Sequence, residues 1–346
     1  MRLCVVIRQM STLDHQLHRL ATVTADYREA DGFKQTTEKV EVFLSQFPAS
    51  ERTDLARTLS NAFEKSYVSK TNLVKYIDKI AQSKKFCGLD PAEFWATAEL
   101  LNIQTKGNSQ ADMVAALNAR IKALVGKRPP KTASTFIYID DAIFSGGTAK
   151  SDLEEWVRYT APVEAELRIV TIGLHGYGQY SVQRHLGKII REVGKDIKIA
   201  FWAFAKFANN PNSPHKSDVL WPREIPDNQD AREYVNSLKY SPKWRIHDDQ
   251  SVFGLFESEA DRHFLEQTLL IAGLKVRSVC PSLNDFQRPL GNHTFSSLGF
   301  GSLFVTFRNC ANNVPIALWA SDPWIPLLPR KTNTDTAFEK LIESLS

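Results

Sequence analysis

The chain has few cysteines and no long apolar run, and these two shortages exclude whole classes of protein. Its four cysteines are scattered over 346 residues, with no CxxC pair and no histidine at zinc-finger spacing. We therefore expect neither a disulfide framework nor a zinc site, but reduced and individually packed thiols.

The most apolar stretch, residues 199–205, ends at Lys206 and is far shorter than the roughly 20 residues that span a bilayer. The first ten residues contain only a short apolar run, below the roughly 7–15 residues of a signal-peptide core. A cytoplasmic protein without a membrane segment is expected.

The sequence also has little net charge. Its 43 Lys and Arg residues against 39 Asp and Glu residues give a formal charge of +4, which does not by itself indicate nucleic-acid binding. The length predicts about two domains. A chain of this size buries roughly 75% of its unfolded surface and needs no disulfide or metal ion to fold.

The positive charge is concentrated in the first part of the chain. Between residues 64 and 85 only Glu64 and Asp78 are acidic, whereas six residues are lysines: Lys65, Lys70, Lys75, Lys79, Lys84 and Lys85. A second basic stretch contains no acid: Arg120, Lys122, Lys127, Arg128 and Lys131. These residues either bind nucleic-acid phosphates or form a solvated helix face, which is the commoner explanation.

The first third of the chain predicts helices. Apolar residues recur at helical spacing in the segments 36–46, 55–67 and 73–80, as on the buried face of an amphipathic helix. Asp90-Pro91 is a favourable helix start, and Ser109 to Asp112 resembles a capping box. We expect few strands before residue 130, and therefore an all-helical N-terminal lobe over residues 1–130.

The pattern changes after the basic, proline-containing linker at residues 126–131. Short apolar runs alternate there with helical segments: strands at 136–139, 167–172 and 197–204, and helices at 151–159 and 182–193. This alternation predicts βαβ units and a parallel sheet. We place this α/β core at residues 131–245.

The remaining residues, 246–346, predict a C-terminal α/β extension that packs on the core. A helix is expected at 257–274, and two strands are expected at 302–307 and 314–318, joined by a turn. A last helix is expected at about 336–345.

One segment concentrates the residues that carry chemistry, Phe136-Ile-Tyr-Ile-Asp-Asp-Ala-Ile-Phe-Ser-Gly-Gly-Thr148. Asp140 and Asp141 follow a strand, at the edge where open parallel sheets bind ligands. The two glycines allow close backbone approach, and the amides of residues 145–148 at a helix N-terminus can bind a phosphate. Carboxylates beside a phosphate would repel it unless they hold sugar hydroxyls or hydrated Mg²⁺. Together these features predict a ribose phosphate bound with Mg²⁺.

The segment resembles the phosphoribosyl-pyrophosphate signature of type I phosphoribosyltransferases: four apolar residues, two acids, three variable residues and Thr/Ser-Gly-Gly-Thr. The resemblance implies an α/β fold with a type I phosphoribosyltransferase-like parallel sheet flanked by helices. It implies that Asp140 and Asp141 bind the ribose 2′- and 3′-hydroxyls and serve as the catalytic candidates. The implied loop for the 5′-phosphate consists of Ala142, Ile143, Phe144, Ser145, Gly146, Gly147 and Thr148.

A longer resemblance extends over most of the chain. Asp26-Tyr-Arg28, the helix from Val40 to Phe47, Asp218-Val-Leu-Trp-Pro222 and the stretch from Leu298 to Asn309 are similar to the phosphoribosyltransferase-like family of bacterial conflict systems. Members are associated with antiphage defence loci, including loci that encode reverse transcriptases. The resemblance implies an effector or accessory component of such a system, with a reverse transcriptase and its nucleic acid as a partner.

The resemblance leaves the activity open. Classical phosphoribosyltransferases carry a pyrophosphate loop and a mobile catalytic loop upstream of the signature, and neither is recognisable in this sequence. The chain is therefore either a phosphoribosyltransferase or nucleotide glycosyl hydrolase, or a non-catalytic subunit that senses a nucleotide or has a structural role.

Three further polar groups have ordinary structural explanations. The first is a polar turn that either contacts the ligand or has only a structural role. Its residues are Arg308, Asn309, Asn312 and Asn313. His247-Asp248-Asp249 is more typical of a surface than of a metal site, since adjacent side chains on a strand point apart. Glu257 and Glu259 near His263 are typical of a helix start.

Overall fold

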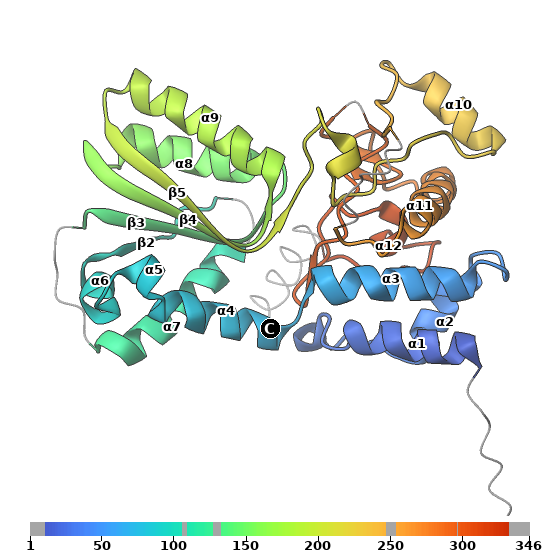
Figure 1. Cartoon of the computed structure of the whole chain (residues 1–346), viewed down its shortest axis with the longest axis horizontal. Helices are drawn as coiled ribbons and strands as arrows, with labels where there is room; N and C mark the ends of the chain where they lie inside the picture. The colour runs from blue at the N-terminus through green and yellow to red at the C-terminus, as the bar shows by residue number, and fades with distance from the viewer. Residues whose placement is uncertain (1–10, 106–108, 127–132, 247–253, 296, 332–346) are drawn as a thin grey trace, which may run out of the picture. The chain divides into compact units, whose positions relative to one another are not determined.

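The structure is a computed structural model that describes residues 11–105, 109–126, 133–246, 254–295 and 297–331 (Figure 1). The chain forms two compact units. The first, called here the two-segment unit, contains the residues up to Ser69 and those from Pro214 onward. The second, called the sheet unit, comprises Lys70–Ser213 and holds the segment with Asp140 and Asp141.

The sheet unit is built on four parallel strands, β2 (Glu99–Leu101), β3 (Thr135–Ile143), β4 (Glu164–His175) and β5 (Asp196–Phe207). Their order in the sheet is β2-β3-β4-β5. Most residues of the two central strands, β3 and β4, are buried, as in parallel strands that helices cover. The predicted parallel sheet is therefore confirmed.

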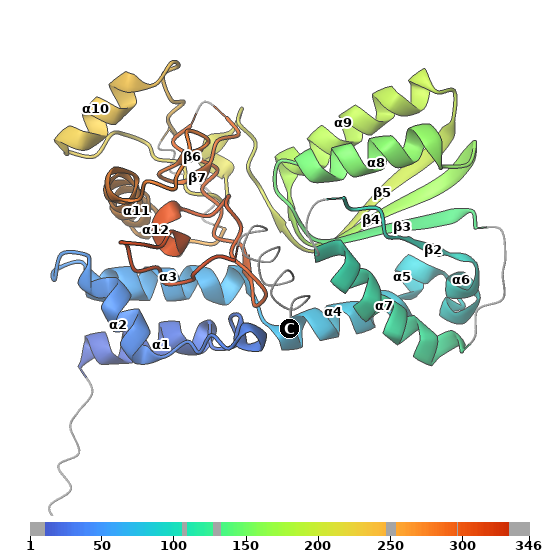
Figure 2. The same cartoon turned by 180° about the vertical axis from the view of Figure 1, so that it is seen from behind.

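Helices cover both faces of this sheet (Figures 1 and 2). Helices α8 (Gly147–Tyr159) and α9 (Gly176–Glu192), which connect β3 to β4 and β4 to β5, lie on one face. The other face carries α4 (Lys70–Gln82), α5 (Lys84–Cys87), α6 (Pro91–Thr97) and α7 (Ser109–Val125). The predicted helices at 151–159 and 182–193 are thus present, each beginning four to six residues earlier than expected. A buried cluster under α8 and α9 forms the core on that side: Phe136, Tyr138, Leu153, Trp156, Leu167, Ile169, Val182 and Leu186.

The prediction of an all-helical N-terminal lobe needs correction. Residues before 131 contribute two short strands, β2 and β1 (Tyr67–Val68). Three residues are too few to establish a hydrophobic period, so β2 is recognisable only through its pairing with β3. Because β2 and α4–α7 belong to the sheet unit, the boundaries of the two compact units also differ from those of the predicted segments 1–130, 131–245 and 246–346.

The two-segment unit is mainly helical. Its long helices are α1 (Thr12–Val23), α2 (Thr37–Ser45), α3 (Arg52–Ser66), α10 (Gln229–Ser237) and α11 (Glu259–Val279). Short 3₁₀ turns occur at Glu29–Asp31 and Pro214–Lys216. Strand β1 pairs in parallel with β8 (Val305–Thr306), and β6 (Gln287–Arg288) pairs with β7 (Gly291–Asn292).

The predicted helix at 257–274 is confirmed as α11, whereas the predicted strand at 314–318 is wrong. That segment contains the short helix α12 (Ile316–Trp319), which follows Pro315. A four-residue apolar run has no period that distinguishes helix from strand, and proline favours the first turn of a helix. The predicted helix at 336–345 and His247-Asp248-Asp249 lie outside the described residues.

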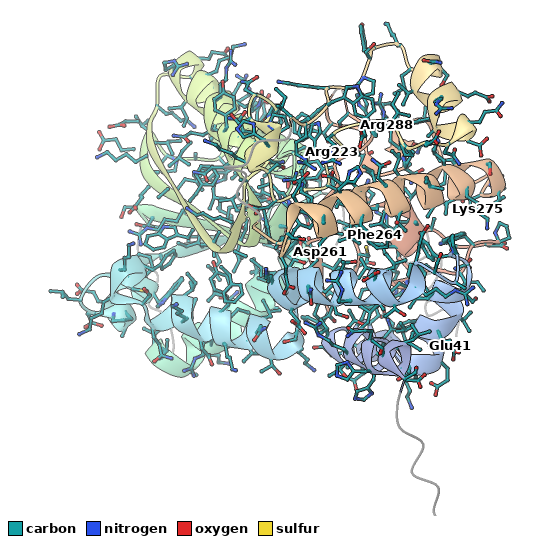
Figure 3. The ribbon with its side chains drawn as sticks, turned by 45° about the vertical axis from the view of Figure 1, so that its right-hand side comes forward. Glu41, Arg223, Asp261, Phe264, Lys275 and Arg288 are labelled. Carbon is teal, nitrogen blue, oxygen red and sulfur yellow. The ribbon has the colours of Figure 1, made fainter. Side chains whose placement is uncertain are left out.

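Helix α11 is held in its unit by ion pairs. On the side that faces α3, Asp261 binds Arg57 at 2.8 Å, and Figure 3 shows Asp261 on the same helix as Phe264 and Lys275. On its buried side, Glu266 Oε2 accepts a hydrogen bond from Arg245 at 2.7 Å. Glu266 Oε1 accepts hydrogen bonds from Arg262 and from the backbone N–H of Trp221, both at 2.9 Å. These side chains of Glu266, Arg245 and Arg262 are fully buried.

In the part of the chain that the structure describes, no helix has the length and apolar character needed to span a bilayer. The described cysteines, Cys87, Cys280 and Cys310, are free and buried, as the sequence predicts.

Candidate functional site

Strand β3 carries the two acidic residues to the carboxyl end of the sheet. The strand continues to Ile143, beyond the predicted end at residue 139, because Ile143 still pairs with Leu174 of β4. Asp140 lies opposite Thr171 of β4 and is only 5% exposed, whereas Asp141 is half-buried. The two carboxyl groups therefore have different environments, although they are adjacent in sequence.

Asp140 is a buried acid with two hydrogen bonds to a single oxygen. Its Oδ1 atom accepts from the Ser109 hydroxyl and from the backbone N–H of Asp141, both at 2.8 Å. Burial raises the pKa of Asp140 well above its ordinary value, and the charge of Asp141 raises the pKa further. A side-chain hydrogen bond between the two acids also favours the protonated form. Asp140 therefore retains its proton to a higher pH than an isolated aspartic acid does.

Ser109 is a site residue that the sequence did not reveal as one. It is the first residue of α7, and its hydroxyl also lies 3.3 Å from Gln104 Oε1. Gln110 fixes the chain after β2, because its side-chain oxygen accepts from the backbone N–H groups of Ile103 and Gln104, both at 2.7 Å. The sequence identified Ser109 only as a helix start. Its contact with Asp140, which is 31 positions away, depends on the pairing of β2 with β3.

The loop after β3 has the form of an anion-binding turn. Gly146 adopts φ +79° at the N-cap of α8, and no side chain caps this helix end. A Cβ atom at Gly146 would lie 2.6 Å from Val182, so both its conformation and its surroundings require glycine. A Cβ at Gly147 would meet only the Ser145 hydroxyl oxygen, at 3.8 Å, and Gly147 and Thr148 are exposed. The uncapped N–H groups of α8 therefore begin beside an open surface, as phosphate-binding helix ends do.

Two residues, Gly178 and His175, pack against this loop. A Cβ atom at Gly178 of α9 would lie 2.2 Å from the carbonyl oxygen of Phe144, so α9 touches the loop backbone. The ring of His175 stacks between those of Phe144 and Phe207, with centroid distances of 4.9 and 5.1 Å. Burial lowers the pKa of His175 to about 3, so the ring is neutral at physiological pH. No local sequence pattern identified either residue, because their roles arise from packing between strands and helix.

The polar turn at 308–313 belongs to the two-segment unit, unlike Asp140 and Asp141. Asn309 donates to the carbonyl of Lys331 at 2.8 Å and accepts from two backbone N–H groups. The carbonyls of Asn312 and Asn313 accept backbone hydrogen bonds from Asn292 and Ser302. These contacts give the asparagines a role in holding neighbouring loops together.

The described residues contain no group of three or more His, Cys, Asp or Glu residues that could hold a metal ion. The two acids of β3 could still provide part of a Mg²⁺ site, because Mg²⁺ is commonly bound by one or two carboxylates together with water and substrate phosphates. The donor set at the end of β3 therefore fits Mg²⁺ that arrives with a phosphorylated ligand.

Comparison with known proteins agrees with this architecture. No curated protein matches the chain. A family model described as PRTase-CE matches residues 40–330, a range that includes the whole parallel sheet, the two acids and the loop at 142–148. The match confirms the predicted likeness to phosphoribosyltransferases and the predicted fold class, an α/β fold with a parallel sheet flanked by helices. The chain therefore belongs to the PRTase-CE family of phosphoribosyltransferase-like proteins.

Proposed function

We propose that the end of β3 binds a ribose phosphate, either phosphoribosyl pyrophosphate or a nucleotide, together with Mg²⁺. The observation that carries the proposal is the continuous unit of strand, glycine turn and uncapped helix. It brings an acidic pair and an anion-binding loop within a few residues of each other. The acids suit a diol, because carboxylates accept hydrogen bonds from hydroxyls. The loop suits a phosphate.

The two acids have different roles in this proposal. Asp140 is buried and bonded to Ser109, so it fixes the position of its neighbour and of the loop. Asp141 is half-buried and is the acid that faces the ribose hydroxyls. Because the raised pKa of Asp140 favours its protonated form, the site repels a phosphorylated ligand less than two ionised carboxylates would. Mg²⁺, when bound, supplies further neutralisation of phosphate charge.

The same site could support reaction at the anomeric carbon of the ribose. Transfer or hydrolysis there develops positive charge in an oxocarbenium-like transition state, which nearby carboxylates stabilise. The loop at 145–148 holds the phosphate and thereby orients the ribose. A site that binds without turnover would instead make the protein a nucleotide-sensing or structural subunit.

We also propose that the protein is an effector or accessory component of a bacterial antiphage defence system, with a reverse transcriptase and its nucleic acid as a partner. For the nucleic-acid part of this proposal, the supporting observation is a group of exposed lysines on α4 and α5: Lys70, Lys75, Lys79, Lys84 and Lys85. Exposed lysines on neighbouring helices are suited to contacts with phosphates. Arg120 differs, because it is paired with Asp78 at 2.7 Å.

Calorimetric titration of the full chain with phosphoribosyl pyrophosphate and with nucleotides, each with and without Mg²⁺, tests the ligand. We expect Mg²⁺-dependent binding that Asp141→Asn weakens at least tenfold. Glu164→Gln serves as the control, because it removes an exposed acid of the same unit at the amino end of β4. Absence of binding by every compound would refute the proposed site. Chromatography of the bound ligand then separates an enzyme, which converts it, from a sensor, which releases it unchanged.

A further inference from the structure

Strand β5 forms an edge of the parallel sheet and has one strand neighbour among the described residues. Eleven of its twelve residues pair with residues of β4. For residues 197–206 the structure records no backbone hydrogen bond outside that ladder. Since alternate N–H and C=O groups of a strand point to opposite sides, the outer edge presents a row of groups that another strand can pair with.

The sequence of this edge differs from that of a protected one. Residues 199–205 are seven consecutive uncharged residues, Ile-Ala-Phe-Trp-Ala-Phe-Ala. Most are half-buried, and Phe204 is 48% exposed. Proteins usually shield such an edge with charges, proline or a covering element. Here the charges, Lys198 and Lys206, lie outside the apolar run, which therefore remains open to a partner strand.

The strand is complementary to itself in one antiparallel register. If Phe201 lies opposite Phe201 of a second copy, Asp196 lies opposite Lys206, and this ion pair occurs twice by symmetry. Both side chains are exposed in this structure. Opposite charges on directly facing residues stabilise a strand pair, and like charges destabilise it.

The same register also matches large side chains with small ones. The facing residues alternate in size, so that bulky groups meet alanines: Ile197 with Ala205, Ile199 with Ala203, and Trp202 with Ala200. At the centre the two Phe201 rings meet, and aromatic cross-strand pairs are favourable. In the same register Lys198 lies opposite Phe204. Charge and size complementarity thus favour this alignment.

We propose that two copies of the chain associate through antiparallel pairing of their β5 strands, which joins two four-stranded sheets into one continuous sheet. Such an interface is isologous, as in most homodimers, and uses the strand-addition mode of recognition. The proposal does not depend on the ligand site, because that site lies at the end of β3, whereas the interface uses the outer edge of β5.

A charge swap tests both the dimer and its register. Sedimentation equilibrium of the full chain, 39.1 kDa as a monomer, should show a monomer–dimer equilibrium. In Lys206→Glu, two carboxylates face each other at both ends of the interface, so the dissociation constant should rise about tenfold. The double variant Asp196→Lys with Lys206→Glu restores opposite charges and should return the constant to near the original value.

Lys188→Glu provides a matched control, because it makes the same charge change on the exposed face of α9 and should leave the dimer intact. A chain that stays monomeric at all concentrations would overturn the proposal. So would a dimer that Lys206→Glu leaves unchanged, since association would then use another surface. Loss of the dimer in Lys206→Glu without recovery in the double variant would refute the register, and with it the proposed pairing.

Discussion

Replacing Asp140 by asparagine should stabilise the protein while it weakens the proposed site. The hydrogen bonds from Ser109 and from the backbone N–H of Asp141 both end on Oδ1, and an asparagine carbonyl oxygen in the same place can accept both. The asparagine amide can donate to the Asp141 side chain, as the protonated acid does. The substitution therefore removes a buried charge without removing its contacts. The cost of burying a polar group without full compensation is about 1–3 kcal/mol. Removing the charge also relieves its repulsion with Asp141, so we expect a net stabilisation of about 1–3 kcal/mol at neutral pH.

The pH dependence follows from the direction of the pKa shift. The pKa of Asp140 is raised in the folded state. At pH values above the ordinary pKa of an aspartic acid, roughly 3.9, the unfolded chain therefore releases a proton that the native protein retains, and this difference lowers the free energy of unfolding. This penalty grows as the pH rises towards the folded-state pKa and then stays constant. The advantage of Asp140→Asn should therefore be largest at neutral to alkaline pH and should vanish as the pH falls towards 4.

Urea unfolding of the ligand-free chain, followed by tryptophan fluorescence at several pH values, measures this effect. Trp95, Trp156 and Trp202 report on the sheet unit. The same variant should lose the stabilisation that phosphoribosyl pyrophosphate and Mg²⁺ give to the wild type. A variant less stable than the wild type at pH 7.5 would refute the argument that burial of Asp140 is costly.

Two further predictions concern packing in the two units. Glu266→Gln leaves Arg245 and Arg262 buried beside a neutral partner, so it should lower the free energy of unfolding by about 3 kcal/mol, as measured by chemical denaturation. On α9, Gly178→Ala should destabilise the sheet unit by roughly 1–3 kcal/mol and weaken phosphate binding, because its Cβ would collide with the loop backbone. Gly187→Ala on the same helix has room for its Cβ and should instead stabilise by about 0.5–1 kcal/mol. Equal effects of the two alanines in thermal unfolding would contradict this contrast.

The parts of the structure that sequence reasoning predicted are those with local signals. The segment from β3 to α8 was predictable because an apolar run, two acids and a glycine turn follow one another within thirteen residues. Ser109 and His175 were not, because their importance comes from contacts across the sheet with Asp140 and Phe144.

Short elements were missed or mistaken for a related reason. Strand β2 and helix α12 are three and four residues long, shorter than the span over which a hydrophobic period can be recognised. Their conformation is decided by neighbours, β3 in one case and Pro315 in the other.

The connectivity of the two units has a consequence for the order in which the chain folds. Pairing of Tyr67 and Val68 with Val305 and Thr306 joins segments that lie on either side of the entire sheet unit in sequence. During synthesis, the sheet unit is complete once residue 213 has been made, whereas the two-segment unit must wait for β8. If the sheet unit folds first, it brings Ser69 and Pro214 together as two ends of one compact body. The loop-closure entropy for joining the two segments is then much smaller than for an unfolded insert. A ribosome-bound chain would thus hold the complete sheet unit, with the proposed ligand site, before the second segment of the two-segment unit has been synthesised.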